Sequence, residues 1–121
     1  MEVNTNLLKS FKFAVEGIIL AYKYNRNIRI HTIAAVIALT LCFVLNLSSY
    51  ETSIIIVAIV LVISAEMINT AIEEMVDLIT QEHRQQAKIA KDASAGMVLI
   101  CAIGATVIGV IIFLPHLLSL I

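Results

Sequence analysis

The sequence has no tryptophan, one proline, four glycines and two cysteines. Its proline, Pro115, lies near the C-terminus, so no proline interrupts helices in the central part of the chain. Cys42 and Cys101 both lie in apolar stretches, and we expect buried free thiols rather than a disulfide or a metal site. Because the sequence also lacks low-complexity segments and glycine- and serine-rich linkers, we expect a single domain over residues 1–121.

Several motifs of soluble proteins are absent as well. The sequence contains no G-x-x-x-x-G-K-[ST] loop and no G-x-G-x-x-G fingerprint, which argues against the common soluble nucleotide-binding folds. It has no H-E-x-x-H zinc motif and no G-x-S-x-G nucleophile motif. The N-terminal residues MEVNTNLLKSFKF lack the apolar core and cleavage site of a secretory signal. Since polar residues are so few, we expect no nucleic acid among the partners.

Charged residues are scarce, at 14% of the sequence, whereas hydrophobic residues make up 60% and the mean hydropathy is +0.99. Soluble domains have about 25% charged and about 45–50% apolar residues. The composition therefore predicts an integral membrane protein.

Hydropathy and helical periodicity divide the chain into one amphipathic helix and three apolar spans. Residues 5–23 gather apolar side chains on one face and three lysines on the opposite face, as in a helix that lies in the membrane interface. The spans cover residues 28–47, 53–79 and 93–114, each near the ~20 residues that a bilayer core requires. A polar connector covers 80–92, and the third span is expected to end before Pro115. The predicted fold class is all-α integral membrane.

The positive charges lie on one side of the predicted spans. All eight lysines and arginines fall within residues 1–29 or 84–91, and none lies in the turn at 46–53 or in the C-terminal tail. By the positive-inside rule, the N-terminus and the connector face the cytoplasm, and three spans place the C-terminus outside.

The second span runs into a row of acids in the stretch AEMINTAIEEMVDLI, residues 65–79. A helical wheel places Glu66, Asn69, Glu73 and Asp77 on one stripe about 16 Å long, with Glu74 at its edge. Neighbouring carboxylates repel one another, so they must be paired, protonated or bound to cations. An acid as deep in the membrane as Glu66 indicates a functional site.

Two readings stay open for the other polar residues. Asp77 and Glu74 are either functional or simply solvated at the interface. Lys91, at the start of the third span, either pairs with Asp77 or faces an anionic ligand. Carboxylates, an amide and lysines at a membrane boundary suit a phosphate–Mg²⁺ ligand, because Mg²⁺ takes one or two carboxylates with phosphate oxygens and water.

The pattern EMINTAIEEMVD over 66–77, followed by AKIAKDASAG over 87–96, resembles the bacterial diacylglycerol kinase / undecaprenol kinase family. The likeness runs from SFKFAVEGI to IGVIIFLP, nearly the whole chain. It implies a small membrane lipid kinase with one interfacial helix and three spans per subunit. It also implies a homotrimer with shared sites in the bacterial inner (cytoplasmic) membrane, which transfers the γ-phosphoryl group of MgATP to a lipid alcohol.

The resemblance also implies roles for single residues. Glu66 matches the proposed general base, and Glu73 matches a metal ligand that bridges to the ATP phosphates. The residues that match the surroundings of ATP are Asn69, Asp77, Glu82, His83, Arg84, Lys91 and Asp92. Those at the lipid entrance are Asn27, Arg29 and His31. The family usually has an acid, the second metal ligand, where this chain has Asn25, so we expect a second metal site that is either weaker or filled differently.

The acceptor lipid is open at this point. RNIRIH and the tail FLPHLL look more like the undecaprenol kinase branch, with diacylglycerol as the alternative acceptor. A competing hypothesis is a small ion-binding or transport oligomer that uses the same acids. The almost purely apolar outer halves of the three spans argue against a polar path through the membrane.

Overall fold

The computed structural model describes the backbone of residues 2–121 and the side chains of residues 6–121, so Met1 of the predicted domain lies outside it. The described chain is all-helical. Its four helices are α1 (Glu2–Tyr24), α2 (Arg26–Val44), α3 (Ser49–Ile79) and α4 (Gln85–Leu118). Three of them, α2, α3 and α4, are long and apolar enough to cross a membrane. The predicted fold class is confirmed.

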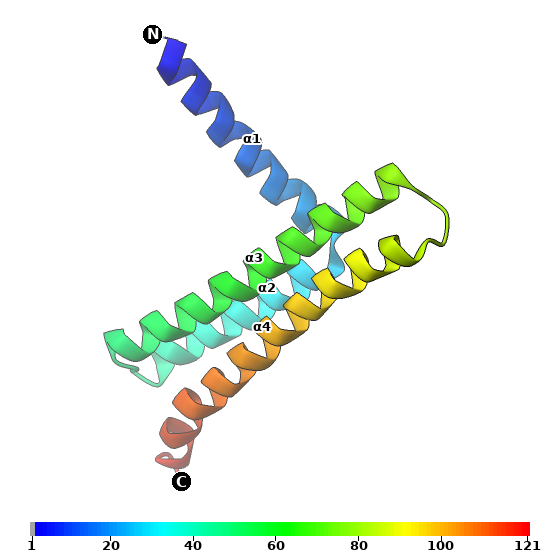
Figure 1. Ribbon diagram of the computed structural model, residues 1–121. Coiled ribbons are helices and arrows are strands. Elements are labelled where there is room, and N and C mark those ends of the chain that lie inside the picture. Colours follow the sequence, from blue (N-terminus) through cyan, green and yellow to red (C-terminus); the bar gives the residue numbers. More distant parts are fainter. Residues whose placement is uncertain (1) are drawn as a thin grey trace.

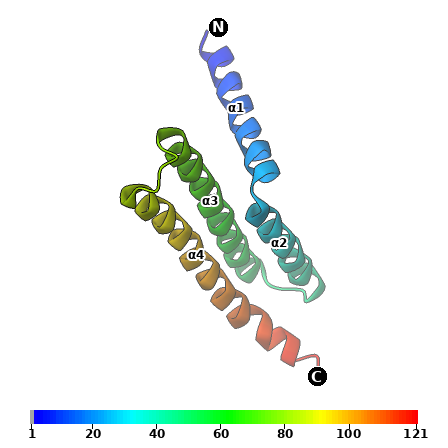
Figure 2. The ribbon, with the colours of Figure 1, turned by 90° about the vertical axis from the view of Figure 1, so that its right-hand side faces the viewer.

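The three apolar helices lie side by side, and α3 packs along both α2 and α4. The first helix, α1, extends away from this bundle at the end where α2 begins (Figures 1 and 2). Its apolar side chains Leu7, Leu8 and Phe11 are exposed. An amphipathic helix with an uncovered apolar face is what an interfacial position requires.

The fourth helix is longer than the predicted span at 93–114. It begins at Gln85, where the amide of Lys88 donates to the Arg84 carbonyl at 3.0 Å, so the connector is only 80–84. Glutamine, alanine and lysine are good helix formers, and nothing in this stretch breaks a helix. The helix also continues through Pro115 to Leu118, contrary to expectation. Because Pro115 lies in the last turns, its missing N–H removes only one helical hydrogen bond.

Two polar contacts define the end of the bundle that lies away from α1. Ser48 caps α3: its hydroxyl accepts from the Glu51 amide at 3.1 Å, and the Ser48 amide donates to the Glu51 carboxylate at 3.0 Å. Glu51 Oε1 also lies 3.0 Å from His116 Nε2 on α4. A small apolar cluster with the buried Cys42 packs near this end. Both cysteines are free, as predicted, although Cys101 is only half-buried.

Candidate functional site

The Glu66 side chain is the most deeply buried polar group among the described residues, at 1% exposure. Its two oxygens meet side chains from the start of α2. Asn25 Nδ2 donates to Oε2 at 3.1 Å, and His31 Nε2 lies 3.4 Å from Oε1. A buried carboxylate is costly unless polar partners surround it. Three polar side chains, those of Glu66, Asn25 and His31, therefore meet at one buried position, and two of them come from the start of α2.

Asn25 takes this place because it caps α2. Its Oδ1 accepts from the amides of Asn27 and Ile28, at 2.8 and 3.4 Å, which satisfies donors at the helix start. Its Nδ2 is then free to donate to Glu66 and, at 2.6 Å, to the Thr70 hydroxyl. Asn25 thus contacts the predicted base. Its predicted role as a metal ligand stays a prediction.

A second polar group lies where α3 faces α4. Asn69 is buried, and its Nδ2 donates to Glu73 Oε1 at 3.2 Å. The hydroxyl of Ser94, also buried, donates to Asn69 Oδ1 at 2.7 Å. Ser94 was not among the residues predicted for the site, although it lies one turn after the predicted Lys91 on the same helix. The bond from Ser94 orients the Asn69 amide, which in turn holds the Glu73 carboxylate.

The ion pairs of this region lie at its solvent side. Lys91 Nζ lies 2.5 Å from Asp77 Oδ1, which is the pairing that the sequence left open. Lys88 pairs with Asp92 one turn away on the same helix. All four side chains are substantially exposed. Exposed ion pairs contribute only about 0–1 kcal/mol, so a phosphate group can replace a carboxylate as the partner of a lysine at little cost.

Most residues predicted to surround ATP line one open groove of about 810 Å³ at the α3–α4 connector. The predicted residues in its lining are Asp77, Glu82, His83, Arg84 and Lys91. Within it, Arg84 pairs with Glu82 at 3.1 Å. Asn69 and Asp92 are not part of this lining. The groove therefore presents three basic side chains that carry a fixed charge, Arg84, Lys88 and Lys91.

The three residues predicted at the lipid entrance have different surroundings in the structure. Asn27 is exposed on the first turn of α2. Arg29 Nη1 donates to the Lys23 carbonyl at 3.1 Å and so ties α2 to the last turn of α1. His31 faces Glu66 and lines an apolar groove. These placements do not test lipid binding, which stays a prediction for all three.

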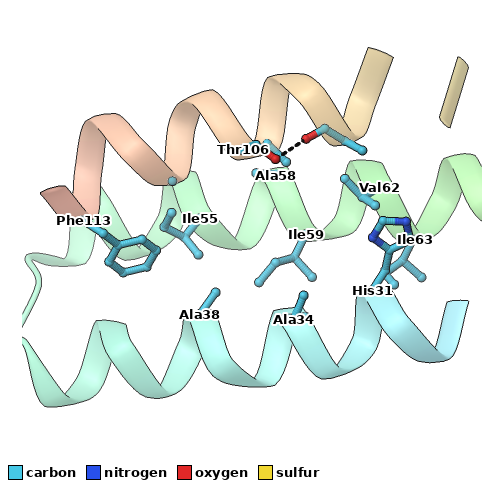
Figure 3. Close-up of a pocket in the computed structure, with 14 residues that line it drawn as sticks. His31, Ala34, Ala38, Ile55, Ala58, Ile59, Val62, Ile63, Thr106 and Phe113 are labelled. Carbon is cyan, nitrogen blue, oxygen red and sulfur yellow. Dashed lines mark hydrogen bonds between the residues drawn. The ribbon is translucent and has the colours of Figure 1, made fainter. Parts of the chain in front are cut away.

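The apolar groove lies between α2, α3 and α4 and has a volume of about 210 Å³. His31 stands at one end and Phe113 at the other, with Ala34, Ala38 and Ile59 between them (Figure 3). Small side chains on α2 keep the groove open. It begins beside the His31–Glu66 contact and continues into the membrane-spanning part of the bundle, so the buried polar cluster and the apolar groove are adjacent.

Among the described residues, no group of three or more histidine, cysteine, aspartate or glutamate side chains lies close enough to hold a metal ion alone. The donor set nevertheless fits Mg²⁺ bound together with a nucleotide. Mg²⁺ commonly keeps several waters and takes one or two carboxylates plus phosphate oxygens. Glu73 would supply one such carboxylate, because only one of its oxygens accepts from Asn69.

The fold and this cluster define an integral membrane protein with buried polar side chains beside an apolar groove in a three-helix bundle. The sequence profile described as prokaryotic diacylglycerol kinase matches residues 12–113. The chain belongs to this family, and it is a lipid kinase, a phosphotransferase.

Three relatives illustrate the range of the family. The chain is 45% identical over 109 residues to the undecaprenol kinase of Bacillus subtilis, covering 90% of this chain and 89% of that protein. It is 42% identical over 120 residues to the diacylglycerol kinase of Synechocystis, covering 98% of this chain and 69% of that protein. Identity to the diacylglycerol kinase of Escherichia coli is 27% over 112 residues, with 93% and 92% covered.

Proposed function

We propose that this chain transfers the γ-phosphoryl group of MgATP to the hydroxyl group of undecaprenol. The observation that carries the chemistry is the buried Glu66, held by Asn25 and His31 next to the apolar groove. Similarity to the B. subtilis undecaprenol kinase, which the chain covers almost end to end, favours this acceptor. Diacylglycerol is the second candidate, because the Synechocystis relative bears that name.

In the proposed reaction, Glu66 takes the proton from the acceptor hydroxyl, and the hydroxyl oxygen attacks the γ-phosphorus of ATP. The bond between the γ-phosphorus and the bridging oxygen breaks, and ADP leaves. A general base contributes about 10²–10⁴-fold to such a step. Phosphoryl transfer otherwise needs positioning and charge neutralisation. Lys91 and Arg84 neutralise phosphate charge in the connector groove, and Glu73 would hold the metal. Bound Mg²⁺ would supply further neutralisation of the phosphate oxygens.

We propose that the connector groove and the N-terminus face the cytoplasm in the bacterial inner membrane, and that the C-terminus lies outside. All eight lysines and arginines support this orientation, since they fall on the proposed cytoplasmic side. ATP would then reach the groove directly from the cytosol.

We also propose a homotrimer with sites shared between subunits. On the face of α3 that turns away from α2 and α4, Ile56, Val60 and Ile68 are exposed, and other copies would cover them. Neighbouring subunits would also enclose the nucleotide, which one connector groove leaves open. Mass measurement in detergent, corrected for bound detergent, is expected to give three chains of 13.2 kDa. An active monomer would contradict the shared site.

The acceptor is tested by direct competition. Vesicles that contain equal mole fractions of undecaprenol and 1,2-diacylglycerol are incubated with purified protein and limiting ATP labelled at the γ-phosphate. We expect most of the label in undecaprenyl phosphate. A majority of the label in phosphatidic acid would overturn the choice of acceptor while leaving the lipid kinase activity intact.

The proposed metal role of Asn25 is tested by Asn25→Glu. A carboxylate binds Mg²⁺ more strongly than an amide oxygen because it brings charge, so the variant is expected to reach half-maximal activity at a lower Mg²⁺ concentration. Activity is measured over a Mg²⁺ series at fixed ATP and fixed lipid fraction. If activity falls and the Mg²⁺ requirement is unchanged, Asn25 serves only Glu66 and the cap of α2.

A further inference from the structure

We propose that His31 is a positioning residue of the reaction: with Asn25 it fixes the direction of the Glu66 carboxylate at the head of the apolar groove. The inference rests on the proposed role of Glu66 as general base. Residues at the start of α2 would thus orient the carboxylate of Glu66 on α3.

The contacts divide between the two oxygens of Glu66. Oε2 accepts a hydrogen bond from Asn25 Nδ2 at 3.1 Å. The other oxygen, Oε1, lies 3.4 Å from His31 Nε2. Asn25 is itself fixed, because its own oxygen caps α2. Oε2 is hydrogen-bonded to Asn25 and Oε1 is in contact with His31, so rotation of the carboxylate about its last bond would disturb both contacts.

The His31 side chain also lines the apolar groove. Figure 3 shows its imidazole ring reaching from α2 toward α3 at the end of the groove, beside Val62 and Ile63. Its side chain is 28% exposed, whereas that of Glu66 is 1% exposed. The imidazole therefore adjoins both the buried carboxylate and the space that an acceptor lipid would enter. A purely structural partner of Glu66 would need no such exposure.

The energetic reason for this arrangement is the short range of proton transfer. A general base must lie about 2.6–3.2 Å from the proton donor. A displacement of about 1 Å in a reacting group costs about 10²-fold in rate. Removing His31 leaves Oε1 without this neighbour, so Asn25 alone restrains the direction of the carboxylate, which stays buried.

The chain offers a matched control at the opposite end of the bundle. His116 Nε2 lies 3.0 Å from Glu51 Oε1, so this pair joins the same two types of side chain. It links α3 to α4 rather than α3 to α2, and neither residue lines the groove. Loss of this contact removes a histidine–glutamate pair without touching the proposed base.

The test compares wild type, His31→Ala, His31→Gln and His116→Ala in vesicles with undecaprenol and labelled ATP, with and without added imidazole. We expect His31→Ala to lower kcat about 10²-fold with an unchanged KM for MgATP. Imidazole should restore much of this activity, because the deleted ring borders an open groove. His31→Gln, which keeps an N–H donor, should retain more activity than His31→Ala, and His116→Ala should keep the wild-type kcat without response to imidazole.

Two results would overturn the inference. One is a His31→Ala variant with wild-type kcat. The other is a loss of activity that imidazole does not restore, in a variant that retains helical circular dichroism and MgATP binding. A wild-type protein that labels neither undecaprenol nor diacylglycerol would instead refute the proposed function, so the two failures are distinguishable.

Discussion

Glu66→Gln is expected to lower lipid phosphorylation by about 10²–10⁴-fold while MgATP binding stays near the wild-type level. Glutamine has nearly the same size, so the buried site stays filled, but its amide cannot take the proton of a hydroxyl group. Most of the residues proposed to bind ATP line the groove at the α3–α4 connector and not the Glu66 site. Their arrangement should therefore persist in the variant. Turnover of labelled lipid and calorimetric titration with MgATP measure the two effects separately.

The matched control is Glu74→Gln, the same substitution on the same helix at an exposed position. Its turnover should resemble wild type, since the proposed chemistry assigns Glu74 no role. If Glu66→Gln turned over within tenfold of wild type, Glu66 would not be the general base.

Glu73→Ala is expected to weaken the binding of Mg²⁺ with ATP by about 10–100-fold, the range typical when support of a metal site is lost. Glu73 offers the carboxylate that Asn69 and Ser94 orient, and Mg²⁺ has few other carboxylates near that point. Titration of ATP at several Mg²⁺ concentrations measures the change. Neighbouring Glu74→Ala provides the control for loss of a negative charge on this turn.

The outcome that would contradict this assignment is specific to the metal. If Glu73→Ala lowered ATP affinity equally at all Mg²⁺ concentrations, the carboxylate would act in folding or nucleotide contact rather than in metal binding. An unchanged metal dependence would likewise remove Glu73 from the proposed site.

Much of the fold follows from the sequence because each signal is local. Apolar runs of sufficient length indicate spans, and the 3.6-residue period places Glu66, Asn69 and Glu73 on one face of α3. On that face, Glu66 contacts Asn25 at the start of α2 and Asn69 contacts Ser94 on α4, whereas Glu73 is exposed and bonds only to Asn69 on its own helix. The ion pair between Lys91 and Asp77 was open in the sequence and is present in the structure.

The contacts between helices could not be predicted in the same way. Periodicity indicates which residues share a face, but the register of one helix against another depends on packing. The convergence of Asn25 and His31 on Glu66 requires α2 to begin just where Asn25 caps it. Helix α4 continues through Pro115 because the loss of one hydrogen bond is tolerated near its end. The rule that proline ends a helix does not account for this position.

The most direct test of the central claim follows the γ-phosphate itself. Wild type and Glu66→Gln are incubated side by side with MgATP labelled at the γ-phosphate and vesicles that contain undecaprenol, and the extracted lipids are separated by thin-layer chromatography. The account predicts label in a phosphorylated lipid with wild type and almost none with Glu66→Gln at equal protein. Label that remains in ATP or appears only as inorganic phosphate with wild type, or equal lipid labelling by both proteins, would contradict it.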